Sequence, residues 1–163
     1  MNDLRYSIEE VSYRDREDRR ILKTCLSNWF YSPKILNFVA PSMTFPFTFS
    51  TWVNYYRKLS GITIFVMKHG GWIVGHISLH FDETTKNAHL FHLFIDPGYR
   101  KRGLAQKMIT VVEDHGSKLG AVSFSLFVLP KNEPARILYE KIGYQEDGLG
   151  RTGGIKYSKI NLD

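Results

Sequence analysis

The chain has 163 residues, of which 43% are hydrophobic and 23% charged, as in ordinary soluble proteins with a single core. Its net charge of +6 favours an anionic partner, either a nucleic acid or a phosphorylated cofactor. The single cysteine, Cys25, excludes an internal disulfide and a cysteine-rich metal site. We find no apolar run long enough to span a membrane and no apolar signal segment at the N-terminus, so we expect a cytoplasmic protein without membrane contact.

The chain begins with the pattern of a short strand followed by a helix. Apolar residues over 6–11 predict the strand. A highly charged stretch then leads into Ile21, after which apolar residues recur every three to four positions as far as Trp29. That spacing predicts one apolar face of a helix, with the charges on its solvated face.

An aromatic-rich segment lies between Trp29 and Tyr56 and holds 10 of the 23 aromatic residues of the chain. We expect prolines to break regular structure in it, and Ser50 or Thr51 to begin a helix that runs to about Leu59. Half of the rings are expected in the core and the others on the wall of a pocket. The prolines are Pro33, Pro41 and Pro46.

A hairpin and a third strand are predicted next. Residues 62–68 and 72–81 favour strands, and Gly70-Gly71 between them supplies a tight turn. Simple alternation in the second strand predicts one face that contains Ile73, Ile77, Leu79 and Phe81. A further apolar strand over 88–95 is stopped by the sequence Asp96-Pro97-Gly98.

The last part of the chain alternates helices and strands. Helical spacing from Leu104 ends at Gly120, and a second helix begins at Asn132 or Glu133, just before Pro134. The strand–helix–strand unit over 88–129 must be parallel and right-handed. The predicted architecture is a single domain over residues 1–163, with strands also at 121–129, 144–151 and 155–162.

The turn between the strand at 88–95 and the following helix has the composition of an anion-binding site. The first amides of a helix lack intrahelical acceptors and lie at the positive end of its dipole. Gly103 has no side chain to keep phosphate oxygens away, and three cations precede it, Arg100, Lys101 and Arg102. A solvated structural turn is the alternative for this sequence.

Two ordered motifs make the chain resemble the GNAT superfamily of N-acetyltransferases. Residues 100–105 satisfy the family's Arg/Gln-x-x-Gly-x-Gly/Ala motif, and the apolar lead-in at 93–99 also matches. Asn132 and Tyr139 match a second cofactor segment. The resemblance implies an α/β fold (α+β in some schemes) with one mixed, mostly antiparallel sheet of about seven strands flanked by helices. Two parallel strands of it, 88–95 and 121–129, would splay apart to hold acetyl-CoA.

The resemblance also implies where the cofactor binds. Backbone groups of Leu93, Phe94 and Ile95 would pair with the pantetheine arm, and the Asn132 side chain would contact the cofactor. Tyr139 would lie near the sulfur and protonate the departing thiolate. The pyrophosphate would be held by the turn that begins at Arg100, through the amides of Lys101, Arg102, Gly103, Leu104, Ala105 and Gln106. A core aromatic without a chemical role is the alternative for Tyr139.

The general base is less well specified. Many relatives have a glutamate at the position of Phe127, and this departure weakens the transfer of their peptide α-amine chemistry. Others place a base at the position of His89, where one member of the family also has histidine. Alternation puts His89 on one face of its strand and His92 on the other. A half-buried structural histidine is an equal alternative for His89, and His92 is expected to serve packing.

The expected function is transfer of acetyl from acetyl-CoA to a primary amine within a ternary complex. Alternatives are a non-catalytic acyl-CoA-binding regulatory module and a basic protein that associates with ribosomes or RNA, although no aromatic-interleaved RNA motif is present. The acceptor would be a small amine or a peptide N-terminus. No carboxylate lies between Trp29 and Tyr56, which argues against a polycationic acceptor. We expect no metal site, and a homodimer is compatible with the sequence.

Overall fold

A computed structural model describes residues 5–150 and 153–162 and contains one seven-stranded sheet. The strand order is β1-β2-β3-β4-β5-β7-β6, and β4–β5 is the parallel pair, while the other pairs are antiparallel. This confirms the mixed, mostly antiparallel sheet expected from the sequence. The strands are β1 (Tyr6–Val11), β2 (Ile62–His69), β3 (Trp72–Asp82), β4 (Asn87–Ile95), β5 (Ser123–Val128), β6 (Gln145–Leu149) and β7 (Ile155–Ile160).

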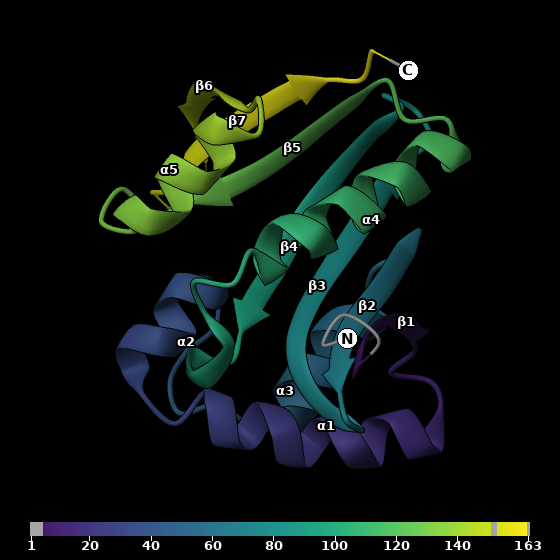
Figure 1. The fold of residues 1–163 in the computed structure, drawn as a ribbon, viewed down its shortest axis with the longest axis vertical. Coiled ribbons are helices and arrows are strands. Elements are labelled where there is room, and N and C mark those ends of the chain that lie inside the picture. Colours follow the sequence, from purple (N-terminus) through teal and green to yellow (C-terminus); the bar gives the residue numbers. More distant parts are fainter. Residues whose placement is uncertain (1–4, 151–152, 163) are drawn as a thin grey trace.

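Helices cover both faces of the sheet (Figure 1). One hydrophobic core lies between the sheet and the α4–α5 face, and a second core packs the sheet against α1, α2 and α3. Among the described residues, no helix is long and apolar enough to cross a bilayer. The helices are α1 (Arg16–Trp29), α2 (Pro33–Val39), α3 (Phe49–Arg57), α4 (Leu104–Leu119) and α5 (Glu133–Lys141), with a 3-10 turn, η2, at Pro97–Tyr99.

Helix α2 corrects one prediction from the sequence. Pro33 was expected to break regular structure, but it occupies the first turn of α2. The preceding Ser32 is the N-cap, and its side chain accepts a hydrogen bond from the Ile35 amide at 3.5 Å. Proline suits this position because the first helical amide needs no intrahelical acceptor and the fixed φ angle is already helical.

Two β-bulges correct the predicted strand faces. The register of β3 shifts opposite Met67 and Lys68, which puts Ile73 in the α1–α3 core while Ile77 lies in the α4 core. The second bulge is in β4, where His92 has a positive φ of 53°. His92 therefore packs on the same face of the sheet as Phe91, not on the opposite face. A bulge adds one residue to a strand and reverses the alternation beyond it.

The β4 bulge is held by a buried chain of hydrogen bonds. The Trp52 indole donates to the Tyr13 hydroxyl at 2.7 Å, and this hydroxyl lies 3.0 Å from His76 Nε2. The backbone carbonyl beside Nδ1 of His76 can only accept, so the neutral ring carries its proton on Nδ1 and accepts the Tyr13 proton at Nε2. That Nδ1 lies 2.8 Å from the backbone carbonyl of His92 and donates to it. This network of hydrogen bonds thus connects α3 and the segment after β1 to the backbone of His92, where φ is positive.

The burial of His76 predicts acid lability. Burial lowers its pKa from 6.5 to about 4, so the folded protein binds fewer protons than the unfolded chain between these values. The contribution of neutral His76 to the free energy of unfolding is complete above pH 6.5 and is lost as the pH falls toward 4. At pH 5.0, His76 should lower the free energy of unfolding by about 2 kcal/mol relative to pH 7.5. In His76→Gln, the difference between these pH values, measured by urea unfolding, should shrink by this amount.

Tyr13→Phe is the matched control for this experiment. It removes the hydrogen bond to His76 but leaves a buried histidine that still titrates, so it should destabilise the protein similarly at both pH values, by about 1–3 kcal/mol. Full pH dependence in His76→Gln would contradict the role of this histidine.

Candidate active site

The two parallel strands diverge soon after they meet. Their paired positions are Asn87–Ser123, Ala88–Phe124 and His89–Ser125, and β4 continues unpaired with β5 to Ile95 (Figure 1). Side chains clamp the closed end. The Asn87 amide donates to Ser125 Oγ at 2.9 Å, and the Ser123 hydroxyl donates to Asn87 Oδ1 at 2.8 Å. Beyond this clamp the opening leaves the backbone edge of β4 available to a ligand.

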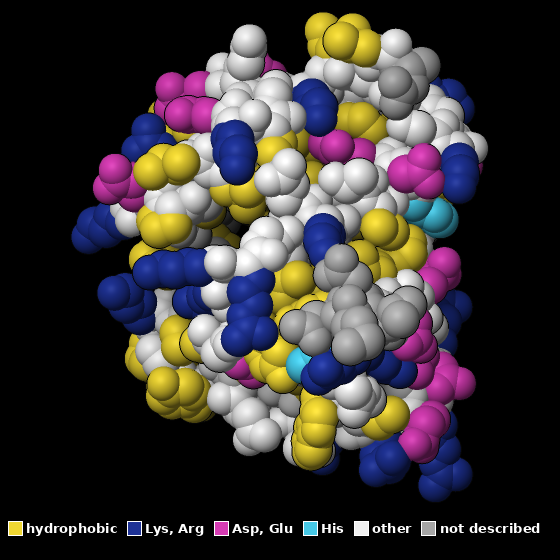
Figure 2. Space-filling view, viewed as in Figure 1, with side chains coloured by type: hydrophobic (Ala, Val, Ile, Leu, Met, Phe, Trp, Pro, Cys, Tyr) yellow, Lys and Arg dark blue, Asp and Glu magenta, His cyan; other side chains and the backbone are white. Residues whose placement is uncertain are grey.

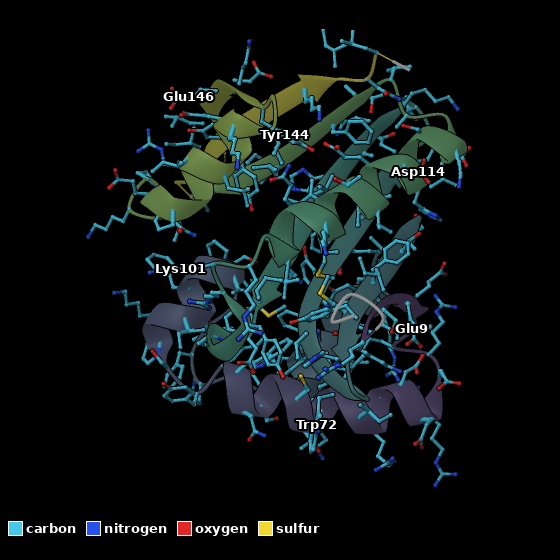
Figure 3. All side chains as sticks on the ribbon, in the orientation of Figure 1. Glu9, Trp72, Lys101, Asp114, Tyr144 and Glu146 are labelled. Carbon is cyan, nitrogen blue, oxygen red and sulfur yellow. The ribbon has the colours of Figure 1, made fainter. Side chains whose placement is uncertain are left out.

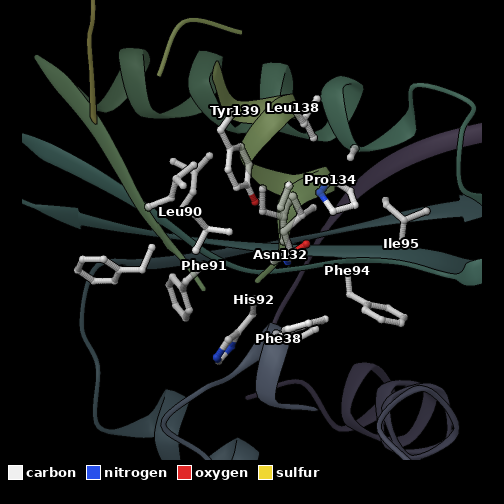
Figure 4. Close-up of a pocket in the computed structure, with 18 of the residues that line it drawn as sticks. Phe38, Leu90, Phe91, His92, Phe94, Ile95, Asn132, Pro134, Leu138 and Tyr139 are labelled. Atoms are coloured by element: carbon white, nitrogen blue, oxygen red, sulfur yellow. The ribbon is translucent and has the colours of Figure 1, made fainter. Parts of the chain in front are cut away.

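Two adjoining cavities, of about 700 and 440 Å³, lie along this opening. The larger is lined by β4, β5, the start of α5 and the turn before α4 (Figure 4). The smaller lies toward α2, α3 and the closed end of the strand pair. The cavities share seven lining residues, so they meet along one boundary: Phe38, Val39, Leu90, Phe91, His92, Phe127 and Val128.

The start of α4 presents backbone donors at one end of the larger cavity. Gly103 is the N-cap with a left-handed φ of 74°, and a Cβ added there would meet nothing within 4 Å. The first intrahelical bond runs from the Lys107 amide to the Gly103 carbonyl, which leaves the three preceding amides directed out of the helix. Basic side chains gather on this surface (Figure 2), where Figure 3 labels Lys101.

The arginines of the turn are fixed by backbone carbonyls and aromatic rings. Arg100 Nε donates to the Ile95 carbonyl at 2.9 Å, with its guanidinium 5.1 Å from the centre of the Phe94 ring. Arg102 donates to the Gly98 carbonyl at 3.3 Å and lies over Tyr99. Arg100 lines the larger cavity, and Arg102 is exposed beside the turn. The turn is therefore an ordered cationic surface at a helix start, as anion binding requires.

The structure brings the two residues of the second motif to the same cavity. Asn132 is the N-cap residue of α5 but makes no capping bond with its side chain. Tyr139, two turns along α5, is only 8% exposed and directs its hydroxyl into the cavity near Asn132 (Figure 4). Burial raises the pKa of this hydroxyl, which keeps it protonated. A protonated phenol that faces a cavity is able to donate a hydrogen bond to a ligand there.

The other predicted cofactor residues divide between the cavity and its rim. Leu93, Phe94, Ile95 and Ala105 line the larger cavity together with Arg100, Asn132 and Tyr139. Leu104 is buried in the α4 core and anchors the first turn of that helix. The remaining residues are exposed in the turn or just after it: Lys101, Arg102, Gly103 and Gln106.

His89 lines the smaller cavity at the closed end of the strand pair. Its Nδ1 lies 2.8 Å from Ser125 Oγ, and its ring is 4.8 Å from that of Phe127. Burial is the main cause that lowers its pKa to about 4, and the neighbouring His80 adds to the effect. His89 is thus a neutral proton acceptor over the physiological range, and a weaker base than an exposed histidine.

His92 and Tyr56 form a buried pair that the sequence did not suggest. The Tyr56 hydroxyl lies 2.7 Å from His92 Nδ1 and 2.6 Å from Ser78 Oγ. His92 also stacks on Trp52 at 4.3 Å and lines both cavities. Burial lowers its pKa well below the usual value, so it is neutral. No sequence signal could have placed this ring, because its direction depends on the bulge.

The model of the acetyltransferase (GNAT) family matches residues 27–144, most of the chain and both motifs. The chain belongs to this family. It is 31% identical over 122 residues to the catalytic subunit of the N-terminal acetyltransferase B complex of Arabidopsis thaliana, covering 66% of this chain and 67% of that protein. It is 33% identical over 71 residues to the ribosomal protein bS18-alanine N-acetyltransferase of Escherichia coli, covering 44% and 45% of the two chains.

The GNAT fold is also evident from solved structures. A spermidine N-acetyltransferase from Vibrio cholerae, solved with CoA and spermine, superposes with a TM-score of 0.74 over 96% of each chain, at 19% identity. This likeness establishes the fold of this GNAT chain, and its acceptor must be inferred from the chain's own cavity walls.

Other sequence candidates do not form a second site. Within residues 5–150 and 153–162, no group of three or more His, Cys, Asp or Glu side chains could hold a metal ion. Burial raises the pKa of Cys25 to about 12, and its sulfur contacts the Ile73 carbonyl at 4.0 Å. A thiol in this environment is a poor nucleophile.

Proposed function

We propose that this GNAT chain transfers acetyl from acetyl-CoA directly to a primary amine within a ternary complex. The observation that carries the proposal is the meeting of two cavities at the splayed strands, one with a phosphate-type turn and a buried phenol, the other lined by His89. Both substrates can then be present together, which direct transfer requires.

The cofactor would lie in the larger cavity. The turn from Arg100 to Gln106 would hold the pyrophosphate, and the edge of β4 at 93–95, which does not pair with β5, would bind the pantetheine arm. The Asp96 amide donates to the Val74 carbonyl at 2.8 Å on the β3 side. Because successive amides of a strand point in opposite directions, the Ile95 amide faces the opening and can stabilise the thioester oxyanion.

The transfer step forms an N–C bond and breaks the C–S bond. The neutral amine attacks the thioester carbonyl, the amine loses one proton, and the thiolate gains one. Tyr139 would donate a proton to the sulfur from within the larger cavity. His89 would accept the amine proton at Nε2, directly or through water. In that tautomer its Nδ1 proton is donated to Ser125 Oγ.

The role of His89 predicts a particular pH profile. Because burial lowers its pKa to about 4, an acid limb of kcat set by His89 should lie near pH 4 and not near 6.5. His89→Gln should lower kcat about tenfold and remove that limb. The control is His115→Gln on α4, which lines neither cavity and should keep the wild-type profile. An unchanged profile in His89→Gln would exclude His89 as the base.

Turnover of acetyl-CoA tests the proposed function directly. Free thiol is measured with a panel of alkylamines, arylalkylamines, polyamines, amino acids and N-terminal peptides. Acetylation of at least one acceptor at a rate above hydrolysis is the expected result. CoA binding without turnover over the whole panel would favour a non-catalytic binding module, and salt-sensitive RNA binding that CoA does not displace would favour an RNA-associated role.

A further inference from the structure

The walls of the two cavities differ in charge. The larger cavity is lined by three cations, Lys34, Arg100 and Lys131, as expected for a cavity that receives phosphates. Among the described residues that line the smaller cavity, none is Asp, Glu, Lys or Arg. Its only ionisable side chains there are Tyr55 and three histidines, and burial keeps two of these histidines, His89 and His92, neutral.

Four rings form a continuous wall of the smaller cavity. Tyr55 on α3 contacts Phe91 on β4 edge to face, with ring centres 6.3 Å apart. Phe91 stacks with His89 at 6.3 Å, and His89 contacts Phe127 on β5 at 4.8 Å. Phe127 remains 49% exposed, so a large aromatic surface is available to a ligand. Such a wall binds flat or apolar groups.

The absence of carboxylates extends well beyond the cavity lining. Residues 19–81 contain no Asp or Glu, and they form most of α1, all of α2, α3 and β2, and β3 up to its last residue. These elements make the α1–α3 face of the molecule, against which the smaller cavity lies. The two helices of this face that border the smaller cavity, α2 and α3, therefore offer no anionic partner to a second ammonium group of an acceptor.

We propose that the acceptor is a monoamine whose body is uncharged and apolar or aromatic; this inference rests on the proposed acetyl transfer. A single ammonium that enters an uncharged cavity loses its proton more easily, because desolvation disfavours the charged form. The neutral amine that results is the nucleophile. A diamine or polyamine would have to bury a second cation without a partner, which is costly. The cavity therefore selects against polycations and delivers the reactive form of a monoamine.

A matched pair of amines tests this selectivity. Hexylamine and 1,6-diaminohexane have the same chain length and differ by one ammonium group. The kcat/KM of the diamine is first divided by two, because it has two equivalent amines. The kcat/KM of hexylamine should then be at least about tenfold higher. Phenethylamine should match or exceed hexylamine because its ring can pack on the aromatic wall. A diamine as good as hexylamine would overturn the inference, as would turnover confined to peptides.

A carboxylate placed in the cavity should reverse the selectivity. Ser42 lines the smaller cavity and is exposed, so a larger side chain fits there without disturbing the core. Ser42→Glu should raise kcat/KM for 1,6-diaminohexane relative to hexylamine about fivefold. Ser42→Gln, of the same size without the charge, should leave the ratio as in the wild type. Equal ratios in Ser42→Glu and Ser42→Gln would contradict the electrostatic account.

Binding measurements separate a failure of this inference from a failure of the proposed function. If no amine or peptide is acetylated, the proposed function is wrong, and titration calorimetry of the CoA complex with hexylamine and 1,6-diaminohexane still tests the cavity. Tighter binding of hexylamine supports the inference, and equal or weaker binding overturns it.

Discussion

Replacing Gly103 by glutamate is expected to raise the Kd for coenzyme A about 100-fold, equivalent to about 2.7 kcal/mol. Gly103 has a left-handed backbone at the start of α4, and a side chain there costs conformational energy. A glutamate would also place a negative charge beside the amides proposed to hold the pyrophosphate. Because an added Cβ meets nothing within 4 Å, α4 should still form.

Gly120→Glu is the matched control for this variant. Gly120 caps the other end of α4, has a left-handed φ of 103° and also has open space around an added Cβ. The two variants share the backbone penalty and the added charge, but Gly120 is remote from the larger cavity. Titration calorimetry should give a wild-type Kd for Gly120→Glu. Equal Kd values for Gly103→Glu and wild type would show that the turn does not hold the phosphates.

Features that were predicted correctly are those encoded by local chemistry. Helix α4 was bounded by Leu104 and Gly120, because apolar spacing marks the helix and only glycine adopts the left-handed cap easily. Helix α5 begins after Asn132 with proline in its first turn, in the expected order. Arg100 of the turn and Asn132 and Tyr139 of the second motif line the same cavity, and each motif could be found because its residues lie close together in the sequence.

Features that were missed depend on the pairing of strands and on long-range packing. His92 has a φ of 53°, and a histidine in the sequence does not predict a left-handed backbone. The bulge there depends on how β3 and β4 pair. The two hydrogen bonds that link Trp52, Tyr13 and His76 and hold the bulge join residues 39 and 63 positions apart. Of the aromatic segment, Phe38 and Tyr55 line cavities, Trp52 and Tyr56 are buried, and Tyr31 is 73% exposed.

Removal of the Tyr139 hydroxyl should lower kcat about 100-fold and leave the KM for acetyl-CoA nearly unchanged. In Tyr139→Phe the ring is kept, along with its packing against Tyr144 at 6.1 Å and Tyr157 at 6.4 Å. Only the proton donor facing the cavity is lost. Burial raises the pKa of Tyr139, so the hydroxyl stays protonated through the assay range, and the loss should be independent of pH on the alkaline side.

Tyr144→Phe separates this chemical role from a structural one. Tyr144 lies beside Tyr139, but its hydroxyl donates to Glu113 at 2.8 Å and does not line either cavity. Its removal should lower the free energy of unfolding by about 1 kcal/mol and change kcat by less than about twofold. A thioester with a more acidic thiol needs less protonation on departure, so acetyl transfer from such a donor should narrow the gap between Tyr139→Phe and wild type. A gap of the same size with both donors would mean that Tyr139 acts by position and not by proton donation.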